Sequence, residues 1–146
     1  MIAPTPMRVV FDTSVLVAAV RSRKGASFAL VSSIPAPEFQ ICLSVGLHAE
    51  WQGVLTRAEH LPTGRTAEEA LGFLRYLASQ AHLQEIHFLW RPFLPDADDD
   101  MILELAFAAG CRHIVTHNSR DFRGAEQLGV TPIAPGDFLN LIRSRP

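Results

Sequence analysis

Acidic side chains stand at several places in the chain from which they could bind a metal ion. Asp12 directly follows the apolar run 8–11, Glu50 lies within a helical pattern, and four aspartates crowd positions 96–100. Carboxylate oxygens are the ligands that Mg²⁺ and Mn²⁺ prefer. Such an ion holds a phosphodiester and lowers the pKa of a bound water. These acids therefore indicate metal-assisted phosphoryl chemistry, if the fold brings them together.

Each acid also has a structural interpretation, which the sequence leaves open. Asp12 could cap the helix that follows it, and Glu50 could be a solvated helical residue beside an apolar stripe. The acidic run gains only ~0.3–1 kcal/mol per residue from a helix dipole, whereas repulsion grows with each added charge. A divalent cation would relieve that repulsion, and a solvated loop is the alternative. The run consists of Asp96, Asp98, Asp99 and Asp100.

A further polar cluster follows the apolar run that ends at Thr116. Asn118 and Asp121 add an amide and a carboxylate there, although a turn with a capped helix uses the same residue types. The combined set contains no cysteine and needs no histidine, which favours Mg²⁺ or Mn²⁺ over Zn²⁺.

Apolar periodicity predicts strands that alternate with helices along the chain. The strands are expected over 8–11, 39–43, 86–89, 113–116 and 130–133. The helices are expected over 13–20, 26–34, 44–55 with Ser44 as N-cap, 66–81 with a Thr66–Glu69 capping box, 98–109 starting at Asp98 or Asp99 and stopping at Gly110, and 137–142. This alternation predicts an α/β fold with a largely parallel sheet. Polar residues that follow strands should then meet at one edge.

Length and composition predict one compact domain over residues 1–146. The chain has 48% apolar and 19% charged residues and a formal charge of −2. No apolar run reaches the ~18 residues that span a bilayer, and the N-terminus lacks a secretory pattern, so we expect a cytoplasmic protein without membrane contact. Cys42 and Cys111 are expected to be buried, reduced thiols. Twelve of the thirteen cations are arginines, which suits phosphate binding but also fits a GC-rich genome.

Other phosphate-handling folds lack their motifs in this sequence. A haloacid-dehalogenase phosphatase needs a second aspartate at position 14, which is Ser14. A receiver domain needs a late lysine, and the one lysine is Lys24. The P-loop, the dinucleotide-binding glycine pattern and the serine hydrolase elbow are also absent.

Five segments in order resemble PIN-domain proteins, and most of all the VapC-like toxin components of toxin–antitoxin systems. The resemblance covers nearly the whole chain, and its specificity comes from the order of the segments. They are residues 8–17 with Asp12, 44–57 with Glu50, 96–103 with the aspartates, 115–122 with Asn118 and Asp121, and 135–139.

The resemblance implies a PIN-like three-layer α/β/α fold with a central five-stranded parallel sheet. It also implies a Mg²⁺- or Mn²⁺-dependent endoribonuclease, an RNA substrate, a homodimer and an antitoxin that covers the site. The implied catalytic metal ligands are Asp12, Glu50, Asp99 and Asp121. Asp96 and Asp100 are alternatives to Asp99, and Thr13, Ser14 and Thr116 would orient the ligands. Arginines at 21, 23, 120 and 123 are candidates for the RNA backbone.

Two positions depart from the family pattern. Ser14 replaces the usual asparagine, which alters a hydrogen bond that orients the first acid. Asn118 stands where some relatives have aspartate, which removes a charge from a second metal position. A catalytically weakened PIN-fold module that binds RNA or protein is therefore the alternative function, and a small-molecule phosphatase is a third.

Overall fold

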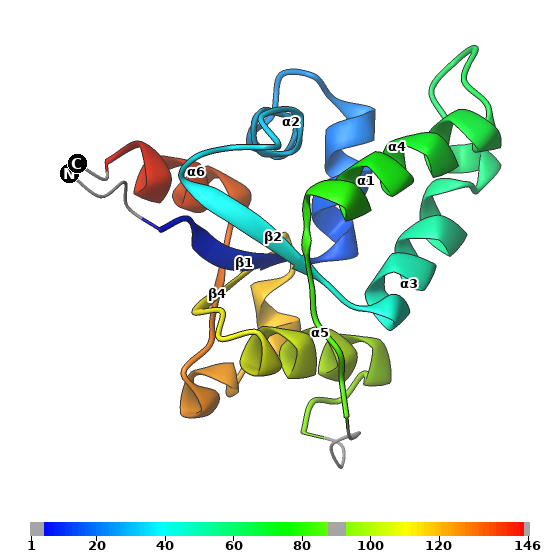
Figure 1. The fold of residues 1–146 in the computed structure, drawn as a ribbon. Helices are drawn as coiled ribbons and strands as arrows, with labels where there is room; N and C mark the ends of the chain where they lie inside the picture. Colours follow the sequence, from blue (N-terminus) through cyan, green and yellow to red (C-terminus); the bar gives the residue numbers. More distant parts are fainter. Residues whose placement is uncertain (1–4, 88–92, 145–146) are drawn as a thin grey trace.

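A parallel five-stranded sheet forms the centre of the computed structural model, which describes residues 5–87 and 93–144 (Figure 1). The strands lie in the order β3-β2-β1-β4-β5, and every pair is parallel. Their bounds are β1 Met7–Phe11, β2 Phe39–Leu43, β3 His82–Leu83, β4 His113–Val115 and β5 Thr131–Ile133.

Helices cover both faces of this sheet and give three layers (Figure 1). α1, α2 and α6 pack against one another on one side, whereas α5 packs on β1, β2 and β4 from the other side. The bounds are α1 Thr13–Arg21, α2 Ala26–Ser32, α3 Val45–Leu55, α4 Ala67–Gln80, α5 Ala97–Ala108 and α6 Pro135–Arg143, with short 3₁₀ helices η1 Ala58–His60, η2 Ser119–Phe122 and η3 Ala125–Leu128. The predicted three-layer α/β/α fold is confirmed. None of the helices in the two described ranges is long and apolar enough to cross a bilayer.

The central strand β1 is apolar on both faces because helices cover it from both sides. Val9, Val10 and Phe11 are fully buried, and burial of each such side chain stabilises the fold by roughly 1.5–3 kcal/mol. The Phe11 ring lies 5.7 Å from that of Phe39, which in turn lies 5.7 Å from Phe138 of α6. This packing fixes the carboxyl end of β1, where Asp12 follows.

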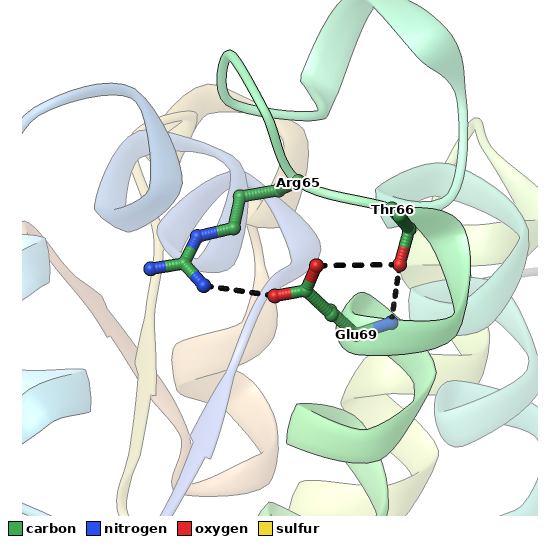
Figure 2. Close-up of polar contacts among 3 residues, drawn as sticks. All are labelled: Arg65, Thr66 and Glu69. Carbon is green, nitrogen blue, oxygen red and sulfur yellow. Dashed lines mark hydrogen bonds and ion pairs between the residues drawn. The ribbon is translucent and has the colours of Figure 1, made fainter.

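The two predicted helix caps are confirmed. The Ser44 hydroxyl accepts the Leu47 N–H at 3.2 Å and starts α3. The Thr66 hydroxyl accepts the Glu69 N–H at 3.1 Å and starts α4 (Figure 2). The Glu69 carboxylate also accepts a hydrogen bond from Arg65 at 2.8 Å, which lowers the pKa of Glu69. Both caps satisfy backbone N–H groups that a helix start leaves unpaired.

Two predicted element boundaries are wrong. Residues 86–87 are not in a strand, and 88–89 lie outside the described residues. The third strand is instead His82–Leu83, because the chain reaches the edge of β2 directly after α4 and the Gln84 N–H donates to the Leu43 carbonyl at 2.9 Å. The N-cap of α5 is Asp96 rather than Asp98 or Asp99, since its carboxylate accepts the Asp98 N–H at 2.8 Å.

Two other predictions of local structure agree with the fold. Gly110 follows α5 with φ of +72°, a left-handed conformation that ends the helix. Cys42 and Cys111 are free and buried, as predicted.

Candidate metal centre

The sheet order reverses around β1, so the carboxyl ends of β1 and β4 lie side by side at one edge of the sheet, which we call the crevice. The chain runs from β1 outward to β2 and β3, then returns to the other side of β1 as β4. In open parallel sheets, ligands bind at such a reversal. Asp12 follows β1 there, and residues 116–121 follow β4. The fold thus brings the predicted strand-end residues to one edge.

Asp12 is held in this crevice by two hydroxyl groups. Its side chain is buried at 7% exposure, and its Oδ2 accepts hydrogen bonds from Ser14 Oγ at 2.8 Å and Thr116 Oγ1 at 2.7 Å. Asp12 occupies the N-cap position of α1 but makes no side-chain capping bond. The capping interpretation is therefore wrong, and the carboxylate is instead oriented toward the crevice.

The same two hydroxyls also fix the loop after β4. Ser14 Oγ accepts the His117 N–H at 3.1 Å, and Thr116 Oγ1 accepts the Asn118 N–H at 2.9 Å. Each hydroxyl therefore directs its single proton to Asp12. Ser14 stands at the position where the family pattern has asparagine. Its hydroxyl donates a hydrogen bond to Asp12 from that position.

Glu50 lies on α3 and is half-buried. The Thr13 hydroxyl donates a hydrogen bond to its Oε2. Burial raises the pKa of Glu50, and the negative charges of Asp98, Asp12 and Asp96 raise it further, against the lowering effect of Thr13. Its ionised form therefore gains from a nearby cation.

Asp99 shows the strongest electrostatic effect of the acidic run. Burial, followed by the charges of Asp121, Asp96, Asp12 and Glu50, raises the pKa of Asp99 to about 7. Acids from four separate segments therefore repel one another at this edge of the sheet. Asp121, on η2, is exposed and contributes the largest of these charge effects.

The two alternatives to Asp99 are engaged with backbone groups. Asp96 caps α5. Asp100 accepts the Leu94 N–H at 2.8 Å and the Phe93 N–H at 3.2 Å. These bonds fix the chain just before α5, and among the three candidates they favour Asp99 as the acid that binds an ion.

Replacing Asp100 with alanine should therefore reduce stability without removing metal binding. Loss of hydrogen bonds from Phe93 and Leu94 to a charged acceptor is expected to cost about 1–2 kcal/mol. Urea unfolding measures this loss, and Mn²⁺ titration of the same variant measures metal affinity. A large loss of affinity with unchanged stability would make Asp100 a ligand and contradict this assignment.

One contact that positions the loop after β4 could not be expected from the sequence. His117 Nε2 lies 2.8 Å from the hydroxyl of Ser27, a buried residue of α2. This bond ties the loop after β4 to a helix 90 residues earlier. Neither residue type nor local spacing marks the pair in the sequence.

The donor set fits a hard divalent cation, although the side chains do not yet converge on one point. Within the described ranges, no three acid, histidine or cysteine side chains lie close enough to hold one ion together. Burial, together with the charges of neighbouring acids, nevertheless raises the pKa of Asp99 and Glu50. Oxygen donors of this kind suit Mg²⁺ or Mn²⁺, with water completing the coordination.

Comparison with known proteins decides the family. The PIN domain family model matches residues 8–120. The chain belongs to the PIN domain family. The match spans β1 to the start of η2 and includes Asp12, Glu50 and Asp99. No match was found among curated proteins.

Solved structures confirm the PIN fold. The chain resembles VapBC-1 from nontypeable Haemophilus influenzae with a TM-score of 0.62 and 15% identity, covering 89% of this chain and 99% of that one. It also resembles VapBC2 from Rickettsia felis, solved bound to a DNA fragment from its promoter, with a TM-score of 0.57 and 15% identity, covering 88% and 98%. At this identity, the likeness concerns the fold of the PIN domain.

Proposed function

We propose that this PIN domain is a Mg²⁺- or Mn²⁺-dependent endoribonuclease and the toxin of a toxin–antitoxin pair. The observation that carries the proposal is that the fold brings acids from four segments to one edge of the sheet, where burial and the charges of neighbouring acids together raise the pKa of Asp99 to about 7. Clustered acids with perturbed pKa values are typical of functional sites. Family membership and the likeness to VapBC structures support the nuclease and toxin assignments.

In this proposal Asp12, Glu50, Asp99 and Asp121 hold the ion. A bound Mg²⁺ or Mn²⁺ supplies charge to a phosphodiester oxygen and acidifies a water. Ser14 and Thr116 keep Oδ2 of Asp12 in place, and Thr13 does the same for Glu50. These side chains preorganise the acids, which reduces the cost of ordering them when the substrate binds.

The arginines divide according to their distance from the crevice. Arg120 and Arg123 are exposed and lie in or directly after η2, beside Asp121. Arg21 ends α1, which starts at the crevice and runs about 12 Å away from it, and Arg23 follows. We therefore favour Arg120 and Arg123 for the RNA backbone. A homodimer, an antitoxin over the site and a cytoplasmic location complete the proposal.

Metal titration and an RNA assay on the same preparations test the proposal. Wild type should bind Mn²⁺ by calorimetry and cleave a mixed RNA substrate. Asp99→Asn should weaken both, whereas Asp137→Asn, a matched change at an exposed residue in the first turn of α6, should retain both. Absence of metal binding and cleavage in the wild type would contradict the proposal.

Removal of a hydroxyl group that orients Asp12 should have a second, smaller effect on RNA cleavage. Thr116→Val removes the bond to Asp12 and the acceptor for the Asn118 N–H. We expect cleavage to fall by about 10–100-fold, while Thr116→Ser, which keeps the hydroxyl, should stay near wild type. Initial rates at saturating Mn²⁺ measure both. Equal losses in the two variants would show that packing, rather than the hydroxyl, matters.

A catalytically weakened binding module is the second candidate. Asn118 in place of an acid favours it, as does the lack of three converging ligands among the residues of 5–87 and 93–144. Under this function, chelation and Asp99→Asn would leave RNA binding unchanged, and no cleavage would appear.

A further inference from the structure

A pocket of about 770 Å³ opens between the start of α3, the end of α4, the chain after β3, and α5. Such a volume is within the range of small-molecule sites. Leu43 and Ser44, at the carboxyl end of β2, form part of its wall. The pocket therefore lies toward the same edge of the sheet as Asp12.

Two polar side chains of this pocket are buried without a hydrogen-bond partner. Across the described ranges, four buried side-chain atoms lack one: Glu104 Oε1, His48 Nε2, Trp51 Nε1 and His113 Nδ1. Glu104 and His48 both line the pocket, and Glu104 is only 6% exposed. An unpaired buried carboxylate is costly, and such groups usually have a partner. A ligand with hydrogen-bond donors would supply it.

We propose that this pocket binds a guanine base of the RNA. The Watson–Crick edge of guanine presents two adjacent N–H donors next to one carbonyl acceptor. A carboxylate accepts both donors, and an imidazole with its proton on Nε2 donates to the carbonyl. Glu104, on α5, and His48, on α3, supply these two types of group in the lining of the pocket. Adenine, cytosine and uracil each present only one donor group on this edge.

The rest of the lining suits a flat, uncharged ligand. Leu43, Ala78, Ile86 and Met101 provide apolar surface, and among the residues that the structure describes no lysine or arginine lines the pocket. Protein pockets read unstacked RNA bases by such apolar contact together with bonds to the base edge. The phosphates would then remain outside, near the acids and the exposed arginines.

The position of Met101 in the pocket lining depends on a glycine. A Cβ at Gly46 would lie 2.6 Å from Met101 Sδ, so any side chain there would displace Met101. Gly46→Ala therefore alters the pocket without changing its charge.

The use of this pocket rests on the proposed ribonuclease function. α3 contains both His48 of the pocket and Glu50 of the crevice. A guanine held here would select the position of the RNA chain over the acids. Cleavage should then occur preferentially next to guanine.

Mononucleotide titration tests the site independently of cleavage. Calorimetry on wild type should show 5′-GMP binding about tenfold or more tightly than 5′-AMP. Inosine monophosphate, which lacks the 2-amino donor, should bind about fivefold more weakly than GMP. Glu104→Gln should abolish this preference, whereas Glu68→Gln, a matched carboxylate change at an exposed residue in the first turn of α4 and outside the pocket lining, should retain it. Equal affinity for GMP and AMP in the wild type would overturn the proposal.

Two further variants distinguish a failure of the guanine proposal from a failure of the proposed nuclease function. Asp12→Asn should bind GMP as the wild type does even though it no longer cleaves, so the pocket and the nuclease are tested separately. Gly46→Ala should weaken GMP binding by displacing Met101, and thermal melting reports whether it folds. An arginine-rich peptide that binds in place of GMP, with loss in Glu104→Gln, would assign the pocket to a protein partner and overturn the guanine proposal.

Discussion

Asp12→Asn should lower RNA cleavage by at least ~10³-fold, equivalent to about 4 kcal/mol of transition-state stabilisation. Asp12 is the buried acid of the crevice, and its Oδ2 accepts two hydroxyl protons. Asparagine has nearly the same shape and retains one oxygen acceptor, but it removes the negative charge that a divalent cation needs. Single-turnover cleavage of a labelled RNA at saturating Mn²⁺ measures the loss.

The control for Asp12→Asn is an acid outside the crevice. Asp137 lies exposed in the first turn of α6, and Asp137→Asn should cleave like the wild type. Thermal melting of both variants should remain close to that of the wild type, because the Asp12 site is preserved in shape. Cleavage by Asp12→Asn within tenfold of the wild type would rule out Asp12 as a ligand.

Asp99 should make the metal-free protein less stable as the pH rises. Its pKa of about 7 lies above the ordinary value of 3.8, so the folded state holds a proton that the unfolded state has released between these values. Stability therefore falls across this range and remains reduced above pH 7. Asp99→Asn removes the effect. Since the carboxylate is half-exposed and screened, the variant should be more stable at pH 8 by about 1 kcal/mol.

Mn²⁺ should make the wild type more stable than Asp99→Asn at pH 8. A ligand at a hundredfold excess over its Kd stabilises the folded state by about 2.7 kcal/mol, which corresponds to a rise in Tm of roughly 5–10 °C. The wild type should show this rise at pH 8, and Asp99→Asn should show little of it. Melting at pH 5 and pH 8, with chelator and with Mn²⁺, measures both effects. If the difference in Tm between wild type and Asp99→Asn is the same at pH 5 and pH 8, with chelator and with Mn²⁺, the assignment of Asp99 as a metal ligand is contradicted.

The sheet was largely predictable because its central strands are continuous apolar runs. Residues 39–43 were predicted as a strand with its observed bounds, and 8–11 missed only Met7. The edge strand β3 has two residues, one of them an exposed leucine. So short an edge strand has no apolar periodicity, and the apolar run at 86–89 was chosen in its place.

The site was predictable in its residue types but not in its contacts. Sequence position placed Asp12 at a strand end, yet only the fold shows that Ser14 and Thr116, 102 residues apart, both bond its Oδ2. Within the acidic run, each aspartate could cap a helix or bind an ion. The backbone bonds of Asp96 and Asp100 separate these roles, and they depend on chain geometry that no local pattern specifies.

The directions of β1 and α6 determine where a tag or a surface can be attached to this protein. β1 begins at Met7, at the amino edge of the sheet, and α6 runs back to that edge, where Phe138 packs on Phe39 and His113. The start of β1 and the end of α6 accordingly lie on the same side of the molecule (Figure 1). The crevice of Asp12 lies at the opposite edge. An affinity tag, fluorophore or surface linker joined at either end would therefore leave the acids accessible, and immobilised protein would present them to the solution.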